Sequence, residues 1–358
     1  MIYLHVPFCR SFCTYCDFYS EIACRGRDAQ VFESYADAVC AEIARRWDEI
    51  EAVRDLDTLY VGGGTPSVLP LSLLRKMAAA ALMTGGVCEF TVEVNPEDIV
   101  EKGAEYVRGL LEMGVNRISM GVQSLDDGIL RWMNRRHDAA RARQAFRVLR
   151  EAGMDNISVD LIFGLSQLSE DTLSRTVSEV LEWRPEHISA YQLSIEEGSA
   201  LGCLVREGRY NEASQEACAE QYALLCQRLR EVGYVHYEIS NWALPGREAI
   251  HNSAYWTRHP YVGLGPGAHS FDGRVRSWNS RTPAGWTCES ETLSAAEVRE
   301  EKIMLGLRTA RGIPVSLLNA VQTAPLLADG RLVQTGDGRL RIPEDRWFVS
   351  DGLIADLI

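Results

Sequence analysis

Three cysteines close to the amino end have the residue type and the spacing to hold a metal cluster. Cys9, Cys13 and Cys16 follow the pattern Cys-x-x-x-Cys-x-x-Cys, so their thiols can converge from one tight loop. Structural zinc sites use four closed ligands, usually in two separated pairs, and no fourth cysteine lies nearby in the sequence. Three thiolates suit a [4Fe–4S] cluster that keeps one iron open, because sulfur ligands select such clusters. The alternatives are a zinc site completed by His5 and three buried small side chains.

Small and polar residues follow the later strand candidates in a similar way. In parallel α/β folds, the loops at the carboxyl ends of the strands carry the active site. The strand candidates lead into Gly62-Gly63-Gly64-Thr65-Pro66, Glu93-Val94-Asn95-Pro96 and Gln123-Ser124, while Asp160 lies within a strand and Ser194 follows another. Packing alone does not explain such residues at every strand end. For a lone carboxylate, a helix cap or a surface ion pair is the alternative.

Six apolar segments alternate with amphipathic segments over the first half of the chain. The strand candidates are Ile2–Val6, Thr58–Gly62, Phe90–Val94, Arg117–Gly121, Ile157–Phe163 and His187–Leu193, and the helical patterns are Val31–Ile50, Leu71–Leu82, Val100–Met113, Ala139–Ala152 and Glu170–Trp183. Repeated strand–helix units with continuous apolar strands predict a parallel sheet covered by helices. The pattern alone does not distinguish a curved partial barrel from a flat doubly wound sheet.

The second half of the chain changes in character. Glu212–Val232 and Ser294–Thr309 have helical patterns, and Val235–Ser240 is predicted as a strand before a stretch rich in proline, glycine and aromatic residues. We expect a core over residues 1–200, an extension over 201–280 and a small C-terminal helical domain over 281–358.

Composition excludes some classes of function. The 358 residues include 37 Lys and Arg against 50 Asp and Glu, a net charge of −13, which argues against nucleic-acid binding because neutralising phosphates needs clustered positive charge. No apolar run approaches the ~18 residues that span a bilayer. Met1–His5 lacks the pattern of a secretory signal, so a cytoplasmic protein is expected. Ten cysteines in such a chain indicate metal or redox chemistry where they cluster, rather than a disulfide framework.

The cysteine spacing, Tyr15 directly before Cys16 and the GGGTP turn resemble the radical S-adenosylmethionine (SAM) superfamily. The resemblance implies a parallel partial (β/α)6 barrel, open on one side. It implies that Cys9, Cys13 and Cys16 hold a [4Fe–4S] cluster whose open iron binds SAM, and that SAM is then split to a 5′-deoxyadenosyl radical. The positions that match SAM contacts of the family are Tyr3, Tyr15, Gly63, Gly64, Thr65, Glu93, Gln123, Arg135, Asp160 and Ser194. Arg135 has a surface helix position as its alternative, since Arg136 is adjacent.

Within the superfamily, the chain resembles the coproporphyrinogen dehydrogenase-like branch along nearly its whole length. The segments that carry this resemblance are YLHVPFC, CTYCDF, YVGGGTPS, EVNPED, NRISMGVQS, DLIFGL, YEISNWA and GLGPGAHS. Phe18 stands where the true dehydrogenases have a further cysteine, and residues 251–256 read HNSAYW, which is typical of the haem-chaperone subgroup. The resemblance implies that His251, Asn252, Tyr255 and Trp256 bind haem.

Other residues are alternatives for the haem contacts. An imidazole can ligate haem iron and aromatic rings can cover a porphyrin face. His259, His269, a methionine or a cysteine could be the ligand instead of His251, which could equally be an ordinary buried histidine. Haem propionates need local cations, and Arg247 and Arg258 are near in sequence, although both could be solvated surface residues.

The preferred function is therefore a haem chaperone with a [4Fe–4S] cluster, SAM and haem, which delivers haem to respiratory or storage haem proteins. The resemblance also implies a reductant protein, a homodimer and a peripheral location at the membrane during delivery as further expectations. The alternative is a radical enzyme, either an oxygen-independent coproporphyrinogen III oxidase or a radical methyltransferase. A zinc-bound structural protein is the third hypothesis.

Overall fold

The structure is a computed structural model that describes residues 1–23, 28–82, 86–282 and 285–358; Cys24 lies outside these residues. Within them, a sheet of nine strands has the order β11-β1-β4-β5-β6-β7-β8-β10-β9. Six of these strands run parallel to one another and follow the chain in order. They are β1 (Ile2–Val6), β4 (Thr58–Gly63), β5 (Glu89–Val94), β6 (Arg117–Gln123), β7 (Ile157–Phe163) and β8 (His187–Gln192). The six predicted strands are confirmed.

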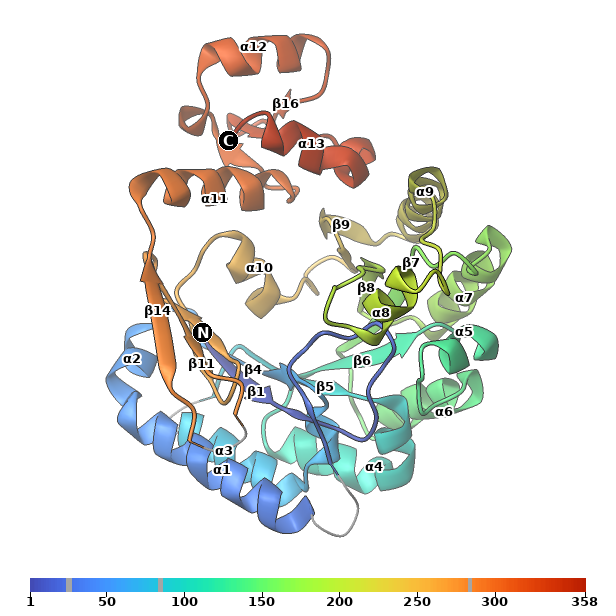
Figure 1. The fold of residues 1–358 in the computed structure, drawn as a ribbon, viewed down its shortest axis with the longest axis vertical. Helices are drawn as coiled ribbons and strands as arrows, with labels where there is room; N and C mark the ends of the chain where they lie inside the picture. The colour runs from blue at the N-terminus through green and yellow to red at the C-terminus, as the bar shows by residue number, and fades with distance from the viewer. Residues whose placement is uncertain (24–27, 83–85, 283–284) are drawn as a thin grey trace.

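Helices cover the outer face of this curved sheet (Figure 1). They are α1 (Asp28–Arg45), α3 (Leu71–Leu82), α4 (Pro96–Glu112), α6 (Ala139–Glu151) and α7 (Glu170–Trp183). Polar side chains fix two of their starts, because Asp138 accepts a hydrogen bond from the amide of Arg141 and Ser169 from that of Thr172. The predicted α/β fold with a parallel partial barrel is confirmed.

Two helix boundaries differ from the prediction. The pattern Val31–Ile50 is two helices, α1 and α2 (Trp47–Ala52), because Arg46 between them leaves helical geometry. The guanidinium of Arg46 instead binds groups on both sides of this junction. Helix α4 begins at Pro96, directly after β5, and is kinked at Gly103 with a φ of 69°.

The strands are not continuously apolar, contrary to the prediction. Their outward residues, such as Leu59, Val61 and Met120, belong to the core between sheet and helices. Tyr60, Glu93, Ser119, Asp160 and Tyr191 all line a cavity on the inner side. Because successive strand residues face opposite sides, each strand gives one face to the packed core and the other to this cavity.

The segment after β8 adds strands at both edges of the sheet. At one edge, β10 (Asn241–Ala243) pairs antiparallel with β8 and with β9 (Val235–Glu238). At the other edge, β11 (Val262–Leu264) pairs parallel with β1. Between these additions, α10 (Ile250–Trp256) crosses the concave side of the sheet (Figure 1). The remaining elements of this segment are α8 (Ala200–Arg206), α9 (Gln215–Glu231), β12 (His269–Phe271), β13 (Val275–Asn279) and β14 (Cys288–Thr292).

The C-terminal part packs around a hydrophobic cluster of its own. Its residues include Ile303, Leu307, Leu340 and Trp347. It contains helices, as expected, and also a three-stranded sheet that the sequence did not indicate. The elements are α11 (Ala295–Leu307), β15 (Ile313–Pro314), α12 (Ala320–Ala328), β16 (Val333–Gln334), β17 (Arg339–Arg341) and α13 (Ser350–Ala355). We propose that this part is a separate domain; the boundaries at 200 and 280 stay predictions.

None of the helices in the described residues is both long enough and apolar enough to pass through a membrane.

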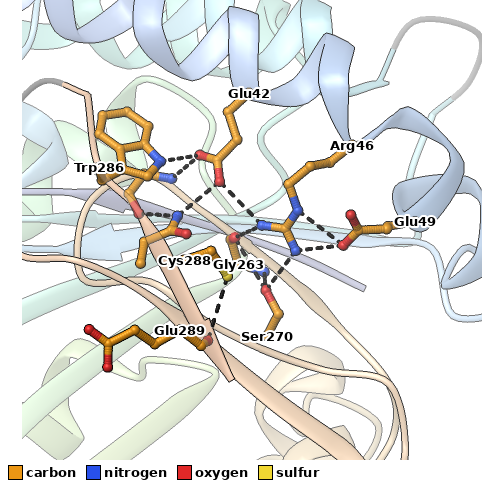
Figure 2. A network of polar contacts seen from close by, with 10 residues as sticks. Glu42, Arg46, Glu49, Gly263, Ser270, Trp286, Cys288 and Glu289 are labelled. Carbon is orange, nitrogen blue, oxygen red and sulfur yellow. Dashed lines mark hydrogen bonds and ion pairs between the residues drawn. The ribbon is translucent and has the colours of Figure 1, made fainter. Parts of the chain in front are cut away.

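A buried polar network joins α1 to the segment that contains the edge strand β11 and the strands after it (Figure 2). The two carboxylate oxygens of Glu42 accept hydrogen bonds from the amide of Gly265 at 2.8 Å, from Asn279 Nδ2 at 2.8 Å and from Trp286 Nε1 at 3.0 Å. Arg46 donates to Glu42 at 3.2 Å and to the carbonyl of Gly263 at 2.8 Å. Four donors therefore converge on one buried carboxylate.

We expect Glu42→Gln to destabilise the protein strongly. The amide would turn a donor toward groups that are themselves donors, and breaking a buried charge pair costs about 3 kcal/mol or more. Denaturant unfolding of the variant measures this loss. Glu49→Gln is the matched control, because Glu49 also pairs with Arg46 but is 58% exposed, and exposed pairs contribute about 1 kcal/mol or less. Equal losses of stability in Glu42→Gln and Glu49→Gln would contradict the conclusion that Glu42 is the buried carboxylate at the centre of this network.

Candidate functional site

One cavity of ≈ 800 Å³ lies at the carboxyl ends of the parallel strands. All three clustered cysteines line it, and so do all ten residues that the resemblance assigns to SAM. These residues are Cys9, Cys13, Cys16, Tyr3, Tyr15, Gly63, Gly64, Thr65, Glu93, Gln123, Arg135, Asp160 and Ser194. Segments from residue 3 to residue 194 thus converge on one site, as the strand-end argument predicts.

The cysteine loop packs directly on the glycine turn. The amide of Gly64 donates to the carbonyl of Val6 at 2.8 Å, which places the turn beside the end of β1. A Cβ atom at Gly64 would lie 2.8 Å from the carbonyl oxygen of Phe8 and 3.1 Å from Cys9 Sγ, so a larger residue does not fit. Thr65 Oγ1 lies 3.5 Å from the same sulfur. The close approach explains why the sequence has glycine at this position.

Two of the three thiols, those of Cys9 and Cys16, lie in surroundings that disfavour the thiolate form unless a cation is present. Burial raises the pKa of Cys16 to about 11 and also raises the pKa of Cys9. Arg135 Nη1 donates to Cys13 Sγ at 3.5 Å. A metal cluster would replace the protons on these sulfurs, because cysteine binds metal as thiolate.

Arg135 lies inside the cavity and not on a helix surface. Its Nη2 donates to Asn95 Oδ1 at 2.7 Å and to the carbonyl of Gly121 at 2.8 Å. Its Nε is buried and has no hydrogen-bond partner among the described residues. The neighbouring Arg136 instead forms an ion pair with Glu97, with Nη1 3.4 Å from Oε1. The two adjacent arginines therefore have different roles, and Arg135 keeps one donor free for a ligand.

Two half-buried carboxyl groups face the cavity, that of Glu93 on β5 and that of Asp160 on β7. Tyr60 donates to Glu93 Oε1 at 2.7 Å and the amide of Gly63 donates to Oε2 at 3.0 Å. Burial raises the pKa of Glu93 to about 7. The hydrogen bond from Tyr60 lowers this pKa, whereas the nearby charge of Asp160 raises it. Burial also raises the pKa of Asp160, to which Ser119 donates at 3.1 and 3.0 Å. Such carboxyl groups gain from a ligand that brings N–H or O–H donors.

The other residues assigned to SAM are held in defined positions at the wall. Tyr3 OH lies 3.0 Å from His5 Nδ1, and Ser194 Oγ donates to Glu196 at 2.5 Å. Gln123 has a φ of 65° at an irregularity in the pairing of β6 with β7. This left-handed conformation is uncommon for a residue other than glycine and is often found at functional sites.

The HNSAYW motif forms α10, which lies mostly behind the cavity wall. Tyr255 lines the cavity, whereas His251 is fully buried and lies behind Tyr60, with ring centroids 5.2 Å apart. Its Nδ1 is 2.8 Å from Thr58 Oγ1 and its Nε2 is 3.0 Å from Tyr255 OH. Asn252 and Trp256 are half-buried and lie away from the cavity. The structure therefore brings one of these four residues to the cavity.

The two arginines considered as partners of the haem propionates also lie away from the cavity. Arg258 Nε pairs with Glu301 Oε2 at 2.7 Å, and Arg247 is exposed. Neither lines the cavity.

Four residues that position the carboxyl groups and the arginine were not predicted in that role from the sequence. These are Tyr60, Asn95, Ser119 and Ser158. The available signal was the alternation of polar residues along strands that otherwise look apolar. In Arg117–Gln123, for example, Arg117, Ser119 and Gly121 alternate with Ile118, Met120 and Val122.

Comparison with known proteins agrees with this architecture. The family model of the radical SAM superfamily matches residues 3–180. The protein named heme chaperone HemW from Mycobacterium tuberculosis is 34% identical over 95% of this chain and 92% of its own length. The HemW of Bacillus subtilis is 33% identical over 87% of this chain and 84% of its own length. The solved structure of coproporphyrinogen III oxidase (HemN) from Escherichia coli, a radical SAM enzyme, superposes with a TM-score of 0.79 at 18% identity over 99% of this chain and 88% of that one.

The chain therefore belongs to the radical SAM superfamily and, within it, to the family of the HemW proteins.

Proposed function

We propose that this protein is a haem chaperone that holds a [4Fe–4S] cluster and SAM and delivers haem to respiratory or storage haem proteins. The observation that carries the proposal is the match over nearly the whole chain to proteins named heme chaperone HemW. Phe18, at the position where dehydrogenases have a cysteine, supports the same choice.

The cavity residues fit the two resident cofactors. Cys9, Cys13 and Cys16 would hold the cluster and leave one iron for SAM. Once reduced by an external reductant, the cluster would supply the electron that splits the sulfonium C–S bond of SAM. Glu93 would accept hydrogen bonds from the amino group of SAM, and Asp160 from its ribose. The unpaired Nε of Arg135 would donate to a carboxylate, since this buried atom has no other partner in the described part of the chain.

A radical enzyme is the second candidate function. The likeness in fold to coproporphyrinogen III oxidase favours it, together with the fact that all ten residues assigned to SAM by resemblance line one cavity. Anaerobic turnover with a reductant distinguishes the two: conversion of propionate to vinyl groups, or a methylated product, would replace the chaperone assignment.

The location and further partners belong to the same proposal. We infer that the protein is cytoplasmic and meets the membrane peripherally during delivery. Its further partners would be a reductant protein and a second copy of the chain. Copurification with membranes at low salt and the mass of the protein in solution test these points.

Haem titration of the anaerobically reconstituted protein tests the main proposal. We expect saturable uptake of one haem for each chain, seen in the Soret band, followed by transfer to an apo haem protein. Absence of haem uptake by wild-type protein would overturn the proposal.

Glu93 gives a pH prediction for SAM binding. Because its pKa is about 7, the carboxylate that accepts from the amino group forms as pH rises through this value. We expect its contribution to make SAM affinity about tenfold weaker at pH 6 than at pH 8. Equilibrium binding of SAM to cluster-loaded protein measures this difference.

Two variants isolate the contribution of Glu93. Glu93→Gln should bind SAM weakly and should lose the part of the pH dependence that comes from the Glu93 carboxylate. Protonation of SAM itself affects its binding to wild type and to both variants equally. Glu105→Gln, on the exposed side of α4, should behave as wild type. Unchanged pH dependence in Glu93→Gln would show that Glu93 does not contact the amino group.

A further inference from the structure

One histidine differs from the others in having free ring nitrogens. All seven histidines lie in the described residues. Six of them have a ring nitrogen in a hydrogen bond or an ion-pair contact: His5, His137, His187, His236, His251 and His259. His269 has no hydrogen bond from its ring to any described residue. Of the seven, only His5 and His269 line the cavity.

His5 is not available to a ligand, whereas His269 is. His5 Nδ1 is 3.0 Å from Tyr3 OH and its Nε2 is 2.9 Å from the carbonyl of Tyr19. His269 begins β12 at the rim of the cavity and is exposed. Burial of part of its ring, with Arg281 and Arg276 nearby, lowers the pKa of His269. Neither ring nitrogen of His269 has a hydrogen bond to a described residue, so a neutral imidazole here presents an unshared electron pair, which is the form that binds metal.

The position of His269 is fixed by packing instead of by ring hydrogen bonds. Its backbone lies against Gly263, where a Cβ atom would be 1.9 Å from the carbonyl oxygen of His269. Its ring stacks with that of Trp278 on β13, with centroids 6.1 Å apart and an interplanar angle of 29°. The ring is thus oriented and its nitrogens remain free.

Arg281 supplies a cation beside this imidazole. It lines the same cavity, is exposed and forms no ion pair with the described residues. Arg276, the other nearby arginine, is already paired with Glu291 and Glu301. Arg281 is therefore free to bind an anionic group of a ligand that contacts His269.

Aromatic side chains complete the rim. Phe18 is 72% exposed although it lines the cavity. Tyr19 packs over Gly267, where a Cβ atom would lie 3.2 Å from its ring. An imidazole, an unpaired arginine and aromatic rings at the rim together match a planar macrocycle that contains iron and bears carboxylates.

We propose that His269 is the axial ligand of the haem iron and that Arg281 pairs with a haem propionate at the rim of the cavity. This inference rests on the proposed haem-chaperone function and names the site of haem binding. It differs from ligation by His251, which would have to break two hydrogen bonds and leave a buried position. Because His269 is exposed, haem held there would be accessible to an acceptor protein, as delivery requires.

Spectroscopic titration with ferric haem tests the ligand. Wild-type protein and His251→Gln should both show the Soret and EPR signature of imidazole ligation. His269→Ala should lose this signature and bind haem at least ~10-fold more weakly, since each tenfold loss of affinity is about 1.4 kcal/mol. Added free imidazole should restore the signature in His269→Ala, which a misfolded variant would not show.

The outcomes separate this inference from the function on which it rests. If wild-type protein binds no haem, both the function and the inference are wrong. If wild type binds haem and His269→Ala keeps the wild-type spectrum, the inference alone is wrong. Loss of the signature in His251→Gln but not in His269→Ala would assign the ligand to His251.

Arg281→Ala provides an independent readout. It should weaken binding of haem without changing the spectrum, and it should not weaken binding of haem dimethyl ester, whose propionates carry no charge. Equal weakening for both haems would contradict the pairing of Arg281 with a propionate.

Discussion

Replacing Cys13 with alanine is expected to leave a folded protein that holds almost no iron. Two remaining thiols cannot fix a [4Fe–4S] cluster, since the arrangement requires three protein sulfurs that converge from the loop after β1. Iron and sulfide content after anaerobic reconstitution should fall from about four of each per chain to near zero. Cys9→Ala and Cys16→Ala should give the same result, because all three side chains line the same cavity.

A matched control variant distinguishes loss of the cluster site from the mere removal of one cysteine thiol. Cys88 is exposed, and its Sγ donates to the carbonyl of Asp57, away from the cavity. Cys88→Ala should therefore keep the full cluster. Stoichiometric zinc in place of iron in wild-type protein would contradict the prediction and favour a structural zinc site.

The sequence was sufficient to predict the centre of the site because its parts are local motifs. The three cysteines lie within eight residues, and Gly63, Gly64 and Thr65 lie within three. A strand that ends directly before each motif places both at one edge of a parallel sheet. Together with the family resemblance, this placement predicts that Cys9 and Gly64 lie close together, and a Cβ atom at Gly64 would indeed lie 3.1 Å from Cys9 Sγ.

The positioning residues depend on contacts that are distant in sequence. Asn95 binds Arg135 across 40 residues, and Ser119 binds Asp160 across 41. The inner face of the barrel was also obscured, because the same strands were read as continuous apolar segments. The alternation of Ser158 and Asp160 with Val159 and Leu161 in β7 shows how one face packs while the other faces the cavity.

The HNSAYW motif shows a different limit of sequence reasoning. Its spacing in a helix places His251 and Tyr255 one turn apart, so both face the same direction. The sequence does not indicate that this direction is the interior of the barrel, where Thr58 and Tyr60 of β4 meet the imidazole. The free histidine of the region, His269, was one of several alternatives and stands out only when hydrogen bonds are known.

His251 provides a large pH effect on stability. Burial lowers its pKa from 6.5 to about 3, with smaller contributions from the amino terminus and Arg117. Between these values the unfolded chain binds a proton that the folded protein excludes. Its contribution to stability is therefore fully present above pH 6.5 and decreases as the pH falls. From pH 6.5 to pH 5 the expected loss is about 2 kcal/mol from this residue.

Denaturant unfolding at several pH values measures this contribution. His251→Gln keeps an uncharged group that can bond Thr58 and Tyr255, so the variant should lose stability less steeply than wild type as the pH falls. Other buried histidines with lowered pKa values, such as His187 and His236, leave some pH dependence in both proteins. His259→Gln is the control, because His259 lies near the surface beside Asp55, with Nε2 3.2 Å from Oδ2. If His251→Gln and wild type lose stability in parallel, His251 is either protonated or hydrated in the folded protein, and its place behind the cavity wall would have to be revised.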